Sequence, residues 1–353
     1  MRTKSLLFFI FTILLCLGFT QKSPTPLYFE VPKGWPKPTY DFKKNTLTEE
    51  SFQLGKSLFY DPYLSSDGMV SCASCHFQGN AFSHRDHHAS HGVGDKMGTR
   101  NSIAIVNLAW SKNFMWDGAI TDLVKQPANP ITNPNEMNET MENVIAKLSK
   151  SKQYPLLFHN AFGTPEVTKD RILLALSHFL VMIKSTDSKY DKVMRKEDHF
   201  TKEEAHGYAI FKEKCASCHT EPLFTNNDFE NNGLPMDPVF KDRGRMQITH
   251  KAKDALKFKV PSLRNSYFSA DYMHDGRFSE LKDVLNHYNT IRPDNNIASQ
   301  LKKPMNLSQG DIEDLYLFLG TLIDKSLMRN LKLAYTKDLY TEKEGLNRMK
   351  QKE

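Results

Sequence analysis

The chain has 353 residues, with 47 Lys and Arg against 41 Asp and Glu, which gives a formal net charge of +6 at pH 7. This length suits two domains. Such a mild charge spread over a large surface carries no nucleic-acid signature. No segment after the first twenty residues is apolar enough to span a bilayer. We therefore expect a soluble protein with no nucleic-acid partner.

Residues 1–20 have the pattern of a cleaved secretory signal peptide. A basic start precedes an apolar run over 6–19, and small residues stand near the end. A retained membrane anchor is the alternative. A lipoprotein site at Cys16 is disfavoured, because Leu15 stands where a small residue is expected.

Composition divides the rest of the chain. Residues 21–45 are rich in Pro and Lys and predict an extended lead-in segment. Lys, Asp, Ser and Arg then replace apolar periodicity over 186–200, which favours a domain boundary there. We expect domains over 46–195 and 196–330, and a tail over 331–353.

Two copies of the pentapeptide C-A-S-C-H each match the attachment signature of a c-type heme. Two cysteines one helical turn apart form thioethers to one porphyrin, and the next histidine lies under the iron as its proximal ligand. A chance CxxC or half a zinc site is the alternative, but zinc sites rarely place His directly after the second Cys. These motifs use every cysteine except Cys16, so no disulfide is proposed. The attachment residues are Cys72, Cys75 and His76 in the first copy and Cys215, Cys218 and His219 in the second. Because this heme is attached outside the bacterial cytoplasm, we expect a periplasmic protein.

Most of the regular structure is predicted to be helix, because strand signals are scarce. Gly55-Lys-Ser-Leu-Phe precedes the first motif and Gly207-Tyr-Ala-Ile-Phe precedes the second, which is a weak internal repeat. We expect an all-α fold of two cytochrome c-like heme domains, with long loops, packed across a shared interface. The predicted helices carry apolar stripes over 141–148, 172–183, 281–288 and 312–322, with starts at Thr168 and Ser279 and a capping box at Thr201–Glu204.

The sixth iron ligand decides what each heme does. A heme whose axial positions are both filled by protein carries electrons, whereas an open position binds peroxide or oxygen. In the second half Tyr288 lies on an apolar helix stripe, as a ligand or as a core tyrosine with a satisfied hydroxyl. Met273, His274 and Met305 are rival ligands, and methionine is the commoner partner in cytochromes c.

In the first half, the segment 129–137 contains a candidate acid and base. A carboxylate over an open heme face can move protons during O–O cleavage. Glu136 fits this role, although a surface glutamate would look the same. The segment 115–118, Met-Trp-Asp-Gly, is also unusual.

Ordered motifs over about residues 50–325 resemble the bacterial diheme cytochrome c peroxidases, which include the methylamine-utilisation enzyme MauG. The motifs are LGKSLFYDPYLS, SCASCH, GTRNS, MWDGAI, NPNEM, KCASCH, FKVPSLRN, YMHDGRF and LSQGDIEDLYLFL. Each alone is weak, and the ordered set is specific.

The resemblance implies a role for each heme. The first would be the low-potential peroxidatic heme and the second the high-potential electron-entry heme. Glu136 matches the distal catalytic glutamate, and Trp116 matches a tryptophan that relays electrons between the hemes, a role compatible with core packing. Gln126 and Pro130 match other residues of the distal pocket.

The resemblance also implies a calcium ion between the hemes. Its side-chain ligand matches Asn101, and two backbone carbonyls match Ser269 and Asp271. Carbonyl oxygens and waters suit this ion. The family usually has Thr and Pro at the last two positions, so this chain departs from the pattern.

Two further positions bear on the type of enzyme. The sixth ligand of the second heme is Met in ordinary peroxidases and Tyr in MauG, and the matching position is Tyr288. A phenolate ligand would lower the potential relative to methionine. Many peroxidases also block the first heme with a loop histidine, but the matching position is Val93. The loop histidines are therefore interpreted as solvated: His84, His87, His88 and His91.

The first functional hypothesis is a periplasmic peroxidase. It reduces hydrogen peroxide to water with electrons from a small cytochrome c or a cupredoxin. The second is a MauG-like enzyme that oxidises residues of a partner protein through a high-valent diheme state. The third is a diheme electron carrier, which needs a protein sixth ligand on both hemes. Dimers occur in the family, so a homodimer is one expectation, although the sequence shows no evident interface.

Overall fold

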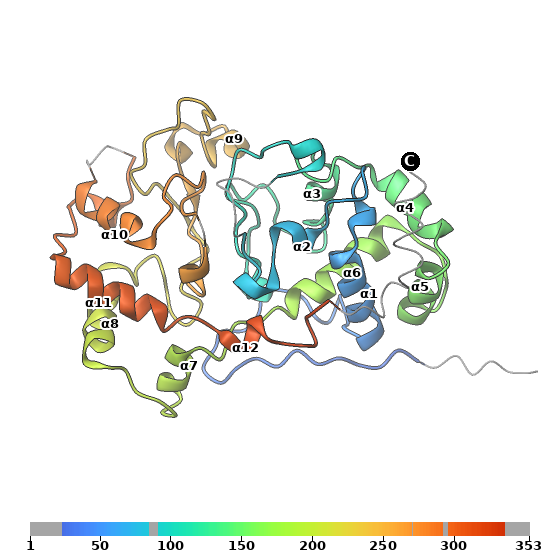
Figure 1. Cartoon of the computed structure of the whole chain (residues 1–353), viewed down its shortest axis with the longest axis horizontal. Coiled ribbons are helices and arrows are strands. Elements are labelled where there is room, and N and C mark those ends of the chain that lie inside the picture. Colours follow the sequence, from blue (N-terminus) through green and yellow to red (C-terminus); the bar gives the residue numbers. More distant parts are fainter. Residues whose placement is uncertain (1–22, 85–90, 270, 292–295, 336–353) are drawn as a thin grey trace, which may run out of the picture.

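The computed structural model describes residues 23–84, 91–269, 271–291 and 296–335, so the predicted signal peptide lies outside it. The regular structure of the described chain is helical apart from one antiparallel pair of two-residue strands, as predicted. Figure 1 shows two halves side by side, with the first heme motif in one and α8, α10 and α11 in the other. No helix of the described part is long and apolar enough to cross a membrane. The elements are α1 (Glu49–Tyr60), α2 (Cys72–Cys75), α3 (Ala128–Thr132), α4 (Met141–Lys150), α5 (Tyr154–Phe162), α6 (Lys169–Val181), α7 (Lys189–Met194), α8 (Lys202–Lys214), β1 (Phe229–Glu230), α9 (Met246–Thr249), β2 (Phe258–Lys259), α10 (Leu281–Thr290), α11 (Gln309–Gly320) and α12 (Lys325–Met328).

The first half is built on the packing of α1 against α6. Gly55 permits the close approach, because a Cβ atom there would lie 1.9 Å from the carbonyl oxygen of Ala175. One turn later Phe59 packs on Phe179, with ring centroids 4.9 Å apart. The helix that leads into the first heme motif is therefore anchored by a glycine and an aromatic pair.

The second half repeats this arrangement with α8 and α11. A Cβ atom on Gly207 would lie 2.0 Å from the carbonyl oxygen of Asp314. Phe211 then packs on Phe318 at 5.1 Å. The weak repeat in the sequence is therefore a structural repeat, in which a glycine-anchored helix precedes each heme motif, directly in the second half and across residues 61–71 in the first.

Several helix starts agree with the predicted caps. Thr168 caps α6 through the backbone N–H of Arg171, and the Thr201–Glu204 capping box opens α8. The prediction of Ser279 at the start of α10 is wrong, because Glu280 is the N-cap and its side chain makes no capping hydrogen bond. Apolar periodicity locates the helix, but it does not determine the first residue to within one position.

Two segments pack differently from the predicted domain limits. In α7, Tyr190 belongs to the second core, and Asp191 forms a bidentate ion pair with buried Arg264, although the sequence placed both with the first half. Leu327 and Leu333 return to the first core. The chain therefore crosses between the two cores at positions other than the predicted domain limits.

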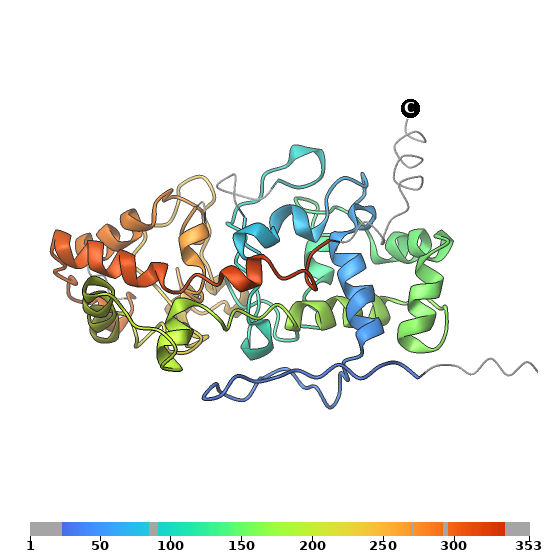
Figure 2. The same cartoon turned by 60° about the horizontal axis from the view of Figure 1, so that its bottom comes forward.

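The lead-in over residues 23–45 lies along one side of the molecule, as Figure 2 shows. Its side chains contribute to the first core through Phe29, Trp35 and Phe42. The indole Nε1–H of Trp110 donates a hydrogen bond to the carbonyl oxygen of Pro36 at 2.7 Å. An extended, proline-rich segment is therefore held by aromatic packing rather than by regular structure.

Candidate heme sites

The second heme motif follows α8 and presents a histidine with one ring nitrogen already bonded. His219 donates from Nδ1 to the carbonyl oxygen of Phe224 at 3.1 Å. Phe224 is fully buried and has a positive φ of 55°. Burial lowers the pKa of His219, so the ring is neutral. A neutral imidazole whose Nδ1 is held by a carbonyl leaves Nε2 for a metal.

The first motif has the same geometry. His76 donates from Nδ1 to the carbonyl oxygen of Phe82 at 3.3 Å. Phe82 is fully buried and also has a positive φ, 58°. Burial lowers the pKa of His76 to about 4. Both histidines are thus suited to be axial ligands, and the loop that fixes each one was not recognised from the sequence.

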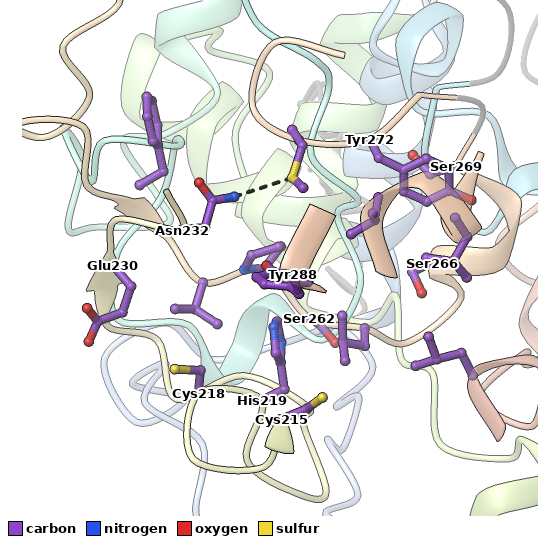
Figure 3. A pocket seen from close by; sticks show the side chains of 18 of the residues that line it. Cys215, Cys218, His219, Glu230, Asn232, Ser262, Ser266, Ser269, Tyr272 and Tyr288 are labelled. Carbon is purple, nitrogen blue, oxygen red and sulfur yellow. Dashed lines mark hydrogen bonds between the residues drawn. The ribbon is translucent and has the colours of Figure 1, made fainter. Parts of the chain in front are cut away.

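A cavity lies over His219, and Figure 3 shows Cys215, Cys218 and His219 on one wall with Tyr288 across from them. Burial raises the pKa of the Tyr288 phenol, and the two cysteine thiols raise it further. This electrostatic effect requires the phenol to lie near the heme motif. The cysteines are unpaired as thiols, so both are available for thioether bonds.

The rival sixth ligands line the same cavity. Met273 accepts a hydrogen bond at its sulfur from Asn232, with Nδ2 and Sδ 3.3 Å apart. The ring of His274 is stacked on Phe258 with centroids 3.6 Å apart. Met305 also lines the wall. The Tyr288 phenol contacts Asn232 as well, so this amide lies between two of the candidate ligands.

Glu136 lies beside the first heme motif. Burial raises the pKa of Glu136, while a hydrogen bond from Asn133 Nδ2 to its Oε1 at 2.7 Å partly offsets the effect. The carboxylate also contributes to the raised pKa of the Cys72 thiol, which is about 12. A half-buried carboxyl with a raised pKa, next to the heme attachment site, has the properties of a proton donor and acceptor.

Neighbouring residues shape this region. Gln126 donates from Nε2 to the sulfur of Met115 at 3.8 Å. The carbonyl oxygen of Pro130 accepts a hydrogen bond from Met137 at 3.1 Å, and that of Glu136 accepts one from Val93 at 2.8 Å. The segment that carries Val93 therefore packs directly against the glutamate.

Two of the four loop histidines are described. His84 lies close enough to His76 to lower its pKa. His91 is bonded to Asp95, with Nδ1 and Oδ1 2.6 Å apart. His87 and His88 lie outside the described residues.

Trp116 stands where the two halves meet. Its indole Nε1–H donates to the carbonyl oxygen of Asn101 at 2.8 Å, and its own carbonyl oxygen accepts from the backbone N–H of Lys259 at 2.7 Å. The indole also lines the cavity of the second heme motif. Trp116 is thus held by backbone groups of both halves, on the wall of the cavity of the second heme motif.

Charged groups next to Trp116 tie the halves together. Arg100 bridges Asp117 of the first half and Asp242 of the second, with N–O distances of 2.7 and 2.6 Å. Arg245 donates to the carbonyl oxygen of Asp117 at 3.0 Å and lies over the ring of Phe229. These contacts fix the interface on which electron transfer between the hemes would depend.

The candidate calcium ligands converge at the same interface. Asn101 donates from Nδ2 to the carbonyl oxygen of Asp271 at 2.6 Å, and the Ser269 hydroxyl donates to the same oxygen at 2.7 Å. Within the described part of the chain, no group of three or more His, Cys, Asp or Glu side chains is arranged to hold a metal ion. Amide and carbonyl oxygens fit calcium, provided that the Asn101 amide turns its oxygen toward the ion.

Comparisons with known proteins agree with this geometry. Residues 49–199 match the family described as di-haem cytochrome c peroxidase. Over 300 residues the chain is 36% identical to the methylamine utilization protein MauG of Methylorubrum extorquens, covering 83% of each chain. The chain belongs to the diheme cytochrome c peroxidase family, which includes MauG. A cytochrome c551 peroxidase of Nitrosomonas europaea is 32% identical over 276 residues, covering 76% of this chain and 79% of the relative.

Solved structures of diheme proteins have the same fold. A MauG-like protein associated with microbial copper homeostasis superposes with a TM-score of 0.77 at 29% identity, over 87% of this chain and 99% of that chain. The diheme peroxidase BthA of Burkholderia thailandensis superposes with a TM-score of 0.70 at 22% identity, over 82% and 90%. The second likeness concerns the fold alone.

A second pair of repeated loops escaped the sequence reasoning. Met-Trp-Asp-Gly and Met-His-Asp-Gly occupy matching places, and their methionines have positive φ values of 67° at Met115 and 71° at Met273. Their glycines do too, 71° at Gly118 and 73° at Gly276. The shared M-x-D-G motif could have revealed this second repeat from the sequence, and it makes Trp116 equivalent to His274.

Proposed function

We propose that this protein is a periplasmic diheme c-type peroxidase. It would reduce one hydrogen peroxide to two waters with two electrons and two protons, taking the electrons one at a time from a small cytochrome c or cupredoxin. The observation that carries the proposal is the half-buried Glu136 carboxyl beside the first heme motif, together with Trp116 at the junction of the two halves. Export through a signal peptide over residues 1–20 is part of the proposal.

The two hemes would supply the redox chemistry when bound, and the chain's own residues would hold them. The four cysteines of the motifs would form the thioethers. His76 and His219, each held at Nδ1 by a carbonyl, would present Nε2 to the iron. Tyr288 would be the sixth ligand in the second half. Two cytochrome c-like domains, joined near residues 186–200, would each carry one heme.

Glu136 would move the proton that peroxide cleavage requires. Its raised pKa keeps a proton on the carboxyl at a higher pH than usual, so the group can both accept and return one. Asn133 orients the carboxyl through the bond to Oε1. Gln126 and Pro130 would shape the same pocket.

Trp116 would provide the path for electrons from the second heme to the first. Its indole is fixed by Asn101 and its backbone by Lys259, so thermal motion at the junction is restricted. Calcium at Asn101, Ser269 and Asp271 would bind next to Trp116, because Asn101 also accepts the indole hydrogen bond. The ion would therefore make this junction more rigid.

Tyr288 favours a second candidate function, a MauG-like oxidation of residues on a partner protein. A phenolate ligand stabilises ferric iron and lowers the potential relative to methionine. The second heme would then be a poorer acceptor from a cytochrome and a better place to share an oxidising equivalent. Both a MauG protein and a cytochrome c551 peroxidase are similar to the chain. Measurements of activity therefore have to distinguish the two candidate functions.

The test compares hydrogen peroxide consumption by the two-heme protein with Glu136→Gln and Glu142→Gln. Gln keeps the shape of Glu136 but cannot exchange the proton, so we expect the rate to fall about 10²–10⁴-fold. Glu142 is exposed on α4 and serves as the matched control, with an unchanged rate. Equal rates for all three proteins would refute the role of Glu136.

A further inference from the structure

Lys259 is a buried lysine on the wall of the second heme cavity. Its exposed fraction is 7%, and it lies in β2. Among the residues that the structure describes, no carboxylate or other polar group is bonded to its ammonium. The other buried cation of this wall, Arg264, is already paired with Asp191. Lys259 is therefore a buried cation that needs a counter-ion.

The burial of the Lys259 ammonium disfavours its charged form. Burial alone lowers the pKa of Lys259 to about 8, with no neighbouring carboxylate to offset it. An unpaired buried ammonium is strongly disfavoured, whereas one that meets a carboxylate in the same cavity is stabilised. A heme carries two propionate carboxylates, so the heme expected in this cavity would supply a negative counter-ion for the Lys259 ammonium.

The internal repeat relates Lys259 to Asn101 at the junction of the two halves. The backbone N–H of Lys259 donates to the carbonyl oxygen of Trp116, and that of Asn101 donates to the carbonyl oxygen of His274. Since Trp116 and His274 are equivalent in the repeated M-x-D-G loops, Lys259 and Asn101 are equivalent too. One position offers an amide for the proposed calcium, and the other offers a built-in positive charge.

We propose that the ammonium of Lys259 pairs with a propionate of the second heme and raises that heme's midpoint potential. This inference rests on the proposed function, because it needs heme at Cys215 and Cys218. Ferric heme carries one more positive charge than ferrous heme, so a nearby cation favours the reduced state. Across about 10 Å at an effective dielectric constant of about 20, one charge changes the reduction equilibrium roughly tenfold.

A smaller cavity offers the competing explanation. It has about 50 Å³ of room and is lined by Lys259 and by Asn227, whose Oδ1 has no hydrogen-bond partner. A water needs only about 15 Å³, so water there could solvate the ammonium instead. In that case Lys259 would stabilise the fold and leave the heme potential unchanged.

The test measures the midpoint potentials of both hemes by spectroelectrochemistry in Lys259→Met, Lys259→Arg and Lys257→Met. We expect Lys259→Met to lower the potential of the second heme by about 59 mV, which is a tenfold change for one electron. The first heme should shift less, and Lys259→Arg should restore most of the loss. Lys257→Met removes the same charge from a position two residues earlier that is less buried than Lys259. The potentials of this variant should be close to those of the wild type.

An unchanged second-heme potential in folded Lys259→Met would overturn the proposal and point to the water at Asn227. A shift of equal size in Lys257→Met would also overturn it, because the effect would then be a general one of net charge. If Lys259→Met fails to fold, Lys259→Gln replaces it in the same comparison. Heme content is measured first. A wild-type protein without heme at the second motif would instead refute the proposed function.

Discussion

The backbone N–H of Lys259 donates a hydrogen bond to the carbonyl oxygen of Trp116 at 2.7 Å. The equivalent bond, from Asn101 to His274, is 2.8 Å long. Each half therefore donates one backbone N–H to the M-x-D-G loop of the other. Trp116 gains a second tether through its indole bond to Asn101. The junction between the hemes is consequently built from paired backbone contacts, which hold a side chain more firmly than a mobile surface contact would.

Trp116→Phe should slow peroxide turnover while both hemes remain attached. Phenylalanine loses the Nε1–H bond to Asn101. Its smaller ring also spans less of the distance between the halves, so electron transfer through it should be slower. Trp110→Phe is the matched control, since its indole also bonds a carbonyl, that of Pro36, but it lies in the first core. Each variant should lose about 1 kcal/mol of stability with its hydrogen bond. Stopped-flow reduction of the first heme would show slowing in Trp116→Phe alone. Equal slowing in both variants would contradict the proposed path.

Glu136→Gln should stabilise the fold at pH 7 but not at pH 4. Burial raises the folded pKa of Glu136, so its stabilising contribution is present below the unfolded value of about 4.3 and is lost as pH rises through the folded value. A neutral glutamine avoids that loss. Thermal unfolding at the two pH values measures the difference, and exposed Glu142→Gln should show none. A lower melting temperature for Glu136→Gln at pH 7 would argue against a raised pKa of Glu136.

Gly207→Ala should destabilise the second half. Its Cβ would lie 2.0 Å from the carbonyl oxygen of Asp314 and 2.9 Å from the Cβ of Phe318, so α8 must move away from α11. Overpacking of this kind costs about 1–3 kcal/mol. In Gly310→Ala, on α11, the nearest atom is 3.8 Å away, and the change should gain up to about 1 kcal/mol. Chemical denaturation of both variants tests the contrast, and similar stabilities would mean that the helices are not in close contact.

Tyr288→Met should raise the midpoint potential of the second heme, because Met/His ligation gives higher potentials. Tyr272→Phe changes another tyrosine of the same cavity without altering a candidate ligand. The absorption spectrum and the potential should therefore change only in the first variant. Identical spectra for wild type and Tyr288→Met would leave Met273, His274 or Met305 as the ligand.

The heme motifs, the helical class and the helix stripes could be predicted because each depends on local spacing. Thr168 and the Thr201–Glu204 box act within one helical turn, so their neighbours in sequence suffice. The repeated GKSLF and GYAIF segments became a structural repeat because glycine and phenylalanine each have one specific contact across the helix pair.

Long-range contacts were not predictable in the same way. Nothing near Tyr190 in the sequence shows that it packs in the second core, since its aromatic partners are distant in sequence: Tyr208 on α8, Phe318 on α11, and Phe224. Lys259 looked like an ordinary lysine in a motif, and only the fold shows that it is buried. The carbonyls of Phe82 and Phe224 hold the two proximal histidines through positive-φ turns that no residue pattern announced.

The most direct measurement is the stoichiometry of peroxide reduction by the wild-type protein carrying two covalently bound hemes. Hydrogen peroxide would be added to an excess of reduced cytochrome c, and donor oxidation would be followed by absorbance. We predict two electrons taken from the donor for each peroxide consumed. A two-heme protein that leaves peroxide unconsumed with reduced donors of both kinds, cytochrome and cupredoxin, would contradict the proposed function.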